Sequence, residues 1–208
     1  MLGRAAGQGY PHATAAALLL SIETIESEDP SGVSGLLLRV VAVLSPEGVR
    51  RNLLDTLNLG DMDESAEGAV DAAVERCVRG SLLSWSVGGD ALIMHRLVGR
   101  ALRERDRASG RWTATLAGAV DMLEPHLFDE SRAWAQRDLG SDLVSQIEAL
   151  WEVTTVEPPD RDIMARELRA RSWGVRQLRA AADLTRAIQL GLYVAADSER
   201  VLGAEHPD

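Results

Sequence analysis

Lysine is missing from this chain of 208 residues, and all 22 of its cationic side chains are arginine. A Walker-type phosphate-binding loop needs a lysine that reaches the terminal phosphates, so the chain cannot carry one. Schiff-base chemistry also needs a lysine amine and is excluded as well. Cys77 is the only cysteine and cannot form an internal disulfide. Its place on an apolar helical stripe predicts that it packs in the core.

Long apolar runs are absent too, because no stretch approaches the roughly 20 residues needed to cross a bilayer. The N-terminus, in which Arg4 is followed by alanine, glycine and glutamine, lacks the apolar segment of a signal peptide. The net charge of −10 disfavours nucleic acids and anionic membranes as principal partners. Binding to either needs a surplus of cationic side chains on the contacting face, and this chain has a surplus of acidic ones. We therefore expect a cytoplasmic protein that binds neither.

Patterns typical of catalysis and metal binding are also missing. His12, His126 and His206 have no metal-ligand spacing with one another or with Cys77. Serine, histidine and acidic residues form no recognisable nucleophile arrangement. The five tryptophans follow helix faces, which is typical of core packing rather than of a ligand cage. The sequence predicts a protein that is not an enzyme.

What the sequence does contain is helical periodicity. Apolar residues at three- and four-residue spacing predict helices from Thr14 to a break at 29–32, then around 37–44, over 47–57 and over 65–79. Ser45-Pro46 provides a natural N-cap and first residue for the third of these helices. The glycine-rich residues 1–13 are expected to form a flexible arm.

Residues 81–98 change to the alternating pattern of two short strands, and Val87-Gly88-Gly89-Asp90 lies between them as a turn. A helix then begins near His95. Helices followed by such a hairpin predict a winged-helix domain over residues 14–108, with the hairpin as its wing. The apolar residues that face one another across the two strands are Leu82, Leu83 and Trp85 on the first and Leu92 and Met94 on the second.

Beyond His95 the whole pattern is helical. One helix ends at 106–110, and the next runs from Trp112 until Pro125 closes it. Asp129 or Ser131 can cap a helix that holds Trp134, and Ser141 can cap another that reaches residue 151. Residues 109–157 are thus expected to form a helical connector, and the fold class is mainly α.

The last part of the chain predicts a helical hairpin. A linker at 154–160 contains Pro158-Pro159, and two long helices over 163–181 and 184–202 follow, joined by a turn at Ala182-Asp183. The second helix carries small residues at 187, 191 and 195, a spacing that lets a neighbouring helix approach closely. An apolar flank of this hairpin is expected to be exposed.

Two motifs carry a resemblance to a known family. Met94-His95-Arg96-Leu97-Val98, at the end of the wing strand, resembles the histidine motif of NB-ARC switch ATPases of the STAND class. Residues 199–208 resemble the helix end and inter-repeat turn of tetratricopeptide repeats of the kinesin-light-chain type. Taken together with residues 22–26, 36–49 and 122–126, they make the chain similar to the middle of an actinobacterial NB-ARC protein with tetratricopeptide repeats, a fragment C-terminal to the nucleotide-binding core.

The resemblance implies a regulatory and protein-binding part of a signalling switch with no NTPase site of its own. Residues 158–208 would begin a truncated repeat array that binds a protein partner, and self-association of the chain is also allowed. ADP or ATP would bind only together with an NB-ARC core in the same or a neighbouring polypeptide. His95 would then donate a hydrogen bond to a β-phosphate oxygen. Family members often have aspartate after this histidine, where Arg96 stands here.

Three alternatives stay open at this stage. His95 could simply cap the helix that follows the wing. The chain could be a free-standing helical-repeat adaptor that never meets a nucleotide. A winged-helix DNA-binding regulator is disfavoured, because residues 61–79 carry more acidic than basic side chains. The one basic cluster, which is interleaved with Glu104 and Asp106, is interpreted as a solvated helix face; it comprises Arg96, Arg100, Arg103, Arg105, Arg107 and Arg111.

Overall fold

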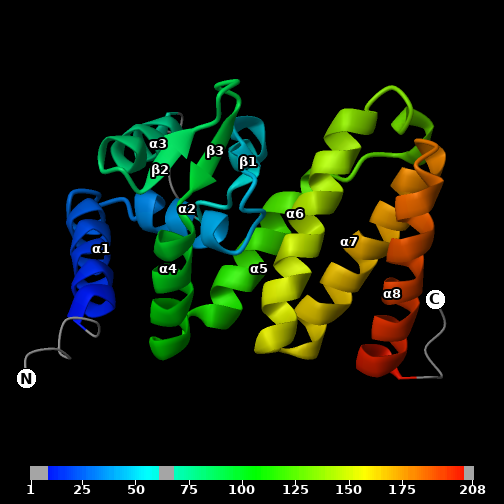
Figure 1. Cartoon of the computed structure of the whole chain (residues 1–208). Helices are drawn as coiled ribbons and strands as arrows, with labels where there is room; N and C mark the ends of the chain where they lie inside the picture. The colour runs from blue at the N-terminus through cyan, green and yellow to red at the C-terminus, as the bar shows by residue number, and fades with distance from the viewer. Residues whose placement is uncertain (1–8, 61–67, 204–208) are drawn as a thin grey trace, which may run out of the picture.

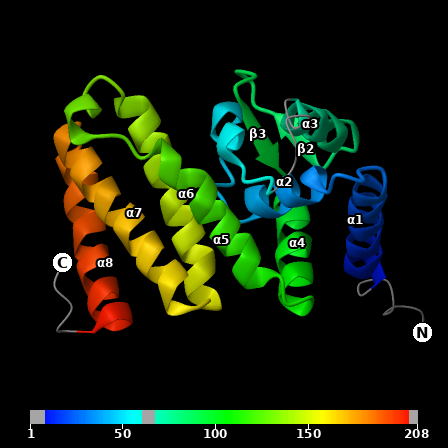
Figure 2. The same cartoon turned by 180° about the vertical axis from the view of Figure 1, so that it is seen from behind.

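Figure 1 shows the computed structural model, which describes residues 9–60 and 68–203. Within these residues the chain is mainly helical, as the sequence predicts, and carries one antiparallel sheet of three short strands. The N-terminal half surrounds the sheet, and the C-terminal half is a row of long helices beside it (Figures 1 and 2). None of the helices in these two ranges is long and apolar enough to span a bilayer.

The N-terminal half consists of helices packed around the sheet, whose strand order is β1-β3-β2. Leu83 pairs with Met94 and Trp85 pairs with Leu92, so the apolar residues of the two hairpin strands do face one another. The elements of this half are α1 (Gly9–Ser27), α2 (Val33–Ala42), β1 (Val49–Arg50), the 3₁₀ helix η1 (Arg51–Thr56), α3 (Ala69–Arg79), β2 (Leu83–Trp85), β3 (Ala91–Met94) and α4 (Arg96–Ala108).

The prediction of a short helix over 47–57 is wrong, because this segment forms β1 and then η1. Gly48 has a φ of 127°, a backbone conformation that L side chains rarely adopt, and it turns the chain into the sheet. Val49 pairs with β3, and the Arg51 N–H donates to the Asp90 carbonyl at 2.9 Å. A strand of two residues is too short to show alternation, so the helical spacing dominated the sequence pattern.

Two helix starts differ from the sequence-based boundaries. Helix α1 begins at Gly9, so residues 9–13 of the expected arm are helical, and residues 1–8 lie outside the described part of the chain. Pro11 falls in the first turn of α1, where its missing N–H removes no helical hydrogen bond. Helix α3 is described from Ala69, and the predicted start at Ser65 also lies outside the described residues.

Asp29 fixes the connection between α1 and α2. Its carboxylate accepts hydrogen bonds from the Ser34 N–H at 2.6 Å and from Ser31, and it lies 3.2 Å from the Arg76 guanidinium of α3. Burial alone would raise the pKa of this carboxyl, but these hydrogen bonds and Arg76 lower it to about 2. The buried charge therefore caps α2 and ties it to α3.

The C-terminal half is a row of helices in which each lies beside the next (Figure 1). The predicted hairpin of two long helices is confirmed, with a left-handed residue, Ala182, in its turn. The elements of this half are α5 (Trp112–Leu123), the 3₁₀ helices η3 (Glu124–His126) and η4 (Glu130–Arg132), α6 (Arg137–Val156), α7 (Arg161–Ala180) and α8 (Leu184–Leu202).

The predictions for residues 129–141 need correction. Asp129 caps only the single turn η4, and Trp134 lies in the turn that follows rather than in a helix. Helix α6 begins at Arg137, so Ser141 is inside its second turn and caps nothing. Gly140, in the first turn of α6, is a position where a Cβ would collide with the Gln177 side chain of α7.

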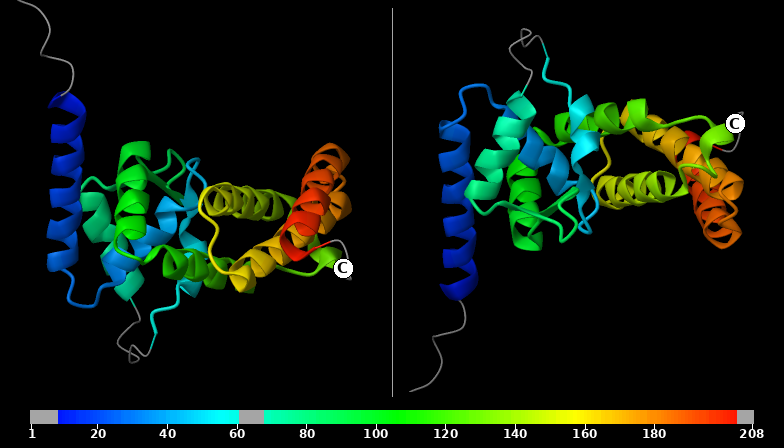
Figure 3. Two further views of the ribbon diagram at one scale, coloured as in Figure 1. Left: turned by 90° about the horizontal axis from the view of Figure 1, so that it is seen from below. Right: turned by 90° about the horizontal axis from the view of Figure 1, so that it is seen from above.

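One continuous apolar core joins the two halves, from Ile22 in α1 to Val194 in α8. Helix α5 is shared, because it packs against α2 and η1 on one side and against α6 and α7 on the other. Its buried residues Leu116, Ala119 and Met122 are each 0% exposed. The views along the vertical axis show α1 and α8 at opposite edges of the molecule (Figure 3).

Candidate functional site

His95 lies between β3 and α4, as the sequence predicts. Its backbone is extended, with φ −63° and ψ 132°, and its carbonyl accepts hydrogen bonds from the Val98 and Gly99 N–H groups. Met94, the last residue of β3, is buried, whereas the His95 side chain is exposed. The strand therefore delivers the imidazole to the surface at the start of a helix.

The imidazole acts as the N-cap of α4. Its Nδ1 accepts a hydrogen bond from the Leu97 N–H at 3.3 Å. Because Nδ1 is the acceptor, a neutral ring carries its proton on Nε2. No described residue hydrogen-bonds to that nitrogen. The same imidazole therefore caps α4 through Nδ1 and presents an N–H donor to the solvent through Nε2.

The surroundings of His95 form an open surface rather than a pocket. Arg96 and Leu97 are exposed, whereas Val98 and Leu102 anchor the opposite face of α4 in the core. Trp85 on the neighbouring strand is also 42% exposed. The positive end of the α4 dipole and the Nε2–H together favour an anion at this surface.

Most arginines of the predicted basic cluster already form ion pairs or hydrogen bonds within the molecule. Arg105 binds both carboxylate oxygens of Glu26 at 2.6 and 2.9 Å, which fastens α4 to α1. Arg96 has no partner among the described residues. The partners of the others are Glu104 for Arg100, the Ala42 carbonyl for Arg103, Glu157 for Arg107 and Asp106 for Arg111.

Helix α3, which precedes the hairpin, offers little to a phosphate backbone. Arg76 is engaged by Asp29 and by the Ser34 hydroxyl, and only Arg79 is left as a cation on the helix. Asp71 is paired with Arg51 from η1 at 2.6 Å. Charge on this face therefore does not favour nucleic acid.

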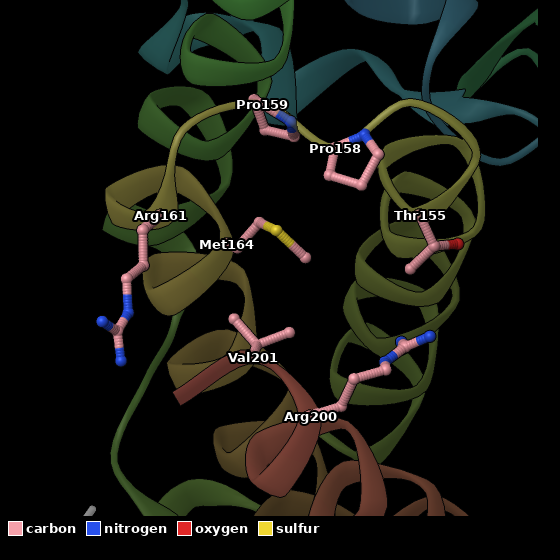
Figure 4. Close-up of a pocket in the computed structure, with 7 residues that line it drawn as sticks. All are labelled: Thr155, Pro158, Pro159, Arg161, Met164, Arg200 and Val201. Carbon is pink, nitrogen blue, oxygen red and sulfur yellow. The ribbon is translucent and has the colours of Figure 1, made fainter. Parts of the chain in front are cut away.

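A hollow of about 410 Å³ lies between the α6–α7 connection and the end of α8 (Figure 4). Met164 and Val201 point into it and Pro158 lies above them, whereas Arg161 and Arg200 extend outward from its sides. The lining suits an apolar side chain. The residues that line it offer no carboxylate, histidine or cysteine for chemistry.

The C-terminal helices are held together by a buried ion network that the sequence analysis missed. Arg171 of α7 is 2% exposed, and it binds Glu148 of α6 through Nε and Asp197 of α8 through Nη1, at 2.7 and 2.6 Å. Its guanidinium also lies over the Trp151 ring, whose Nε1 donates to Asp197. The available signal was an arginine on the apolar stripe of α7, where only a paired charge can be buried.

Glu167, one helical turn before Arg171, is a second buried ionisable group that was missed. It is 1% exposed and accepts a hydrogen bond from the Thr154 hydroxyl at 2.9 Å through Oε1, while Oε2 has no partner. Burial raises the pKa of this carboxyl to about 7, against the lowering effects of Thr154 and Arg171. It faces a small apolar gap between α5, α6 and α7.

No group of three histidine, cysteine or acidic side chains within 9–60 and 68–203 is placed to hold a metal ion. Comparisons with protein-family models, with curated proteins and with solved structures find no match to this chain.

Proposed function

We propose that the chain is the regulatory and protein-interaction portion of a nucleotide-dependent signalling switch of the NB-ARC type, without an NTPase site of its own. In this proposal residues 14–108 are a winged-helix unit, with β2 and β3 as the wing. The order of the helices around the β1-β3-β2 sheet supports it, as does the hairpin that leads directly into α4. Residues 158–208 would be a tetratricopeptide-like hairpin.

One observation carries the proposal. His95 is exposed at the end of the wing, and its Nδ1 is occupied by the helix cap, so Nε2–H is left as a donor. An ADP molecule held by a separate nucleotide-binding core would present β-phosphate oxygens as acceptors for that donor. The dipole of α4 would strengthen the contact. ADP would then tie the wing to the core, and its release would separate them.

Arg96 stands beside the proposed contact with the β-phosphate, at a position where NB-ARC proteins often have aspartate. Its side chain is exposed and has no partner among the described residues, so it can add a second positive charge beside the diphosphate. An aspartate at this position would repel the same anion. We therefore expect Arg96 to support ADP retention in this chain.

The test combines the chain with a matching NB-ARC core and measures ADP retention after gel filtration. His95→Asn keeps an N-cap side chain but removes the imidazole donor, so it should leave the thermal stability unchanged and reduce bound ADP. Arg100→Ala, one turn further along the exposed face of α4, is the matched control and should retain ADP fully. Full retention by His95→Asn would refute the sensor role.

A second candidate is a helical-repeat adaptor that binds a protein partner with no nucleotide. The exposed apolar side chains on the outer face of α8 favour it. The two candidates differ in dependence on nucleotide, so a partner whose binding is unaffected by ADP and by His95→Asn would favour the adaptor. DNA binding is the weakest alternative, because Arg51 and Arg76 around α3 are already paired with Asp71 and Asp29.

A further inference from the structure

Helix α8 has two apolar faces, and only one of them is covered. Ala187, Leu190 and Val194 are buried against α7. Leu184, Ile188 and Leu192 lie on the outer face and are 57%, 65% and 69% exposed. Figure 3 places α8 at the edge of the molecule, where none of the described elements covers this face. A helix that is apolar on two sides is typical of one packed between two neighbours.

The outer face has a pattern that suits a second helix. Leu184, Ile188 and Ala195 are exposed, and Gly191 lies at the border with α7, where a Cβ would come 3.6 Å from Val175. Their spacings of four, three and four residues match the seam of a pair of packed helices. The large side chains lie in the N-terminal half of the seam and the small ones in the C-terminal half. A parallel copy would set large against large and leave a gap between the small residues. An antiparallel copy would set each large residue against a small one.

We propose that the outer face of α8 binds the α8 of a second copy of this chain in antiparallel orientation. Leu184 of one copy then packs on Ala195 of the other, and Ile188 packs on Gly191, with a twofold axis between residues 189 and 190. This assignment does not depend on the proposed nucleotide switch, because it uses no residue of the wing.

Charge is consistent with this orientation. Glu199 is exposed and forms no ion pair with a described residue. The antiparallel arrangement places each Glu199 near the N-terminal end of the other α8, where the helix dipole is positive. Asp183 at that end is already paired with Arg186. In a parallel pair the two Glu199 carboxylates would lie side by side and repel.

The buried area indicates a weak dimer. Leu184 and Ile188 of the seam, together with Leu192 beside it, expose roughly 350 Å² of apolar surface per copy, which is below the ~800 Å² per partner of a standard stable interface. The polar rim of α8 adds to this area. We therefore expect a weak, concentration-dependent association, which sedimentation over a concentration series can follow.

The experiment is sedimentation velocity of the full chain over a concentration series, with circular dichroism to verify folding. Ile188→Glu places a carboxylate in the seam and should raise the dissociation constant by about 100-fold. Ala195→Leu should also weaken the dimer, because the added side chain meets Leu184 of the other copy; in a parallel pair it would fill a gap and strengthen association. Leu20→Glu, at an equally exposed leucine of α1, is the control and should leave the dimer intact.

Cross-linking tests the orientation independently. In the antiparallel pair the two copies of residue 188 are separated by roughly 4.5 Å along the axis and those of residue 199 by roughly 28 Å. Ile188→Cys should therefore form a disulfide-linked dimer under mild oxidation, and Glu199→Cys should not. Cys77 is 0% exposed and does not compete. Cross-linking of both variants, a dimer unaffected by Ile188→Glu, or a chain that stays monomeric throughout would each overturn the proposal, the last because another molecule would then cover this face.

Discussion

Replacing Glu167 with glutamine should change how stability depends on pH. The carboxyl is 1% exposed, and its pKa of about 7 lies above the ordinary value of 4.5. Below pH 4.5 the group is protonated in both the folded and the unfolded chain. As the pH rises from 4.5 to 7, the unfolded chain releases the proton and the folded chain keeps it. The stability contribution is therefore lost over this window and stays lost above it.

The size of the effect follows from the two pKa values. A difference of about 2.5 units corresponds to about 3 kcal/mol of unfolding free energy, lost between pH 4.5 and 8. Glutamine cannot ionise, and its Oε1 can still accept from Thr154. Its amide NH₂ group would take the place of Oε2, which has no hydrogen-bond partner, so the amide donors would be buried without an acceptor. This costs about 1 kcal/mol of stability at every pH.

The assay is urea unfolding of the wild type and of Glu167→Gln at several pH values from 4 to 8.5. Taking the difference in unfolding free energy between the two proteins removes the contributions of the other titrating groups. The variant should gain about 3 kcal/mol in stability relative to the wild type as the pH rises over that range. Glu152→Gln, at an exposed position of α6, is the control. Parallel curves for wild type and Glu167→Gln would refute the interpretation of Glu167 as a buried neutral acid.

Further predictions concern other buried groups. Arg171→Ala leaves Glu148 without its cation and Asp197 with only Arg200, and it should cost about 3–5 kcal/mol in urea unfolding, whereas Arg176→Ala at a surface pair should cost less than about 1 kcal/mol. Asp29 has its pKa lowered from 3.8 to about 2, so it stabilises the fold above pH 4 and this contribution of about 2 kcal/mol disappears as the pH falls toward 2; Asp29→Asn should remove that dependence in an acid titration followed by circular dichroism. Burial raises the pKa of the Cys77 thiol to about 12, so a disulfide reagent should label it only at the rate of global unfolding.

Much of the fold could be predicted from sequence because its helices carry strong apolar periodicity. The hairpin, the start of α4 at His95 and the paired helices α7 and α8 are where the pattern places them. Strand β1 could not be found, since it has only two residues and owes its position to Gly48 and to pairing with β3. Its pairing is a long-range contact, and short windows of sequence do not report such contacts.

The candidate site was predictable in location and incomplete in chemistry. Sequence placed His95 at a strand exit, and the structure adds that Nδ1 is occupied and Nε2 is not. The buried polar groups Asp106, Glu167 and Arg171 were not identified, because a charged residue on a helix looks solvated until its neighbours are known. The small residues of α8 do not share one face either, since Ala187 is buried against α7 whereas Ala195 is exposed.

The shared helix α5 has a consequence for how this molecule unfolds. Helix α5 packs against elements of both the sheet-bearing half and the helical row, so the two halves should unfold in one transition. Cleavage of the chain at residue 108 or 157 would expose core residues on both fragments. A protein that binds α8 would therefore contact the same continuous core that supports the β2–β3 hairpin.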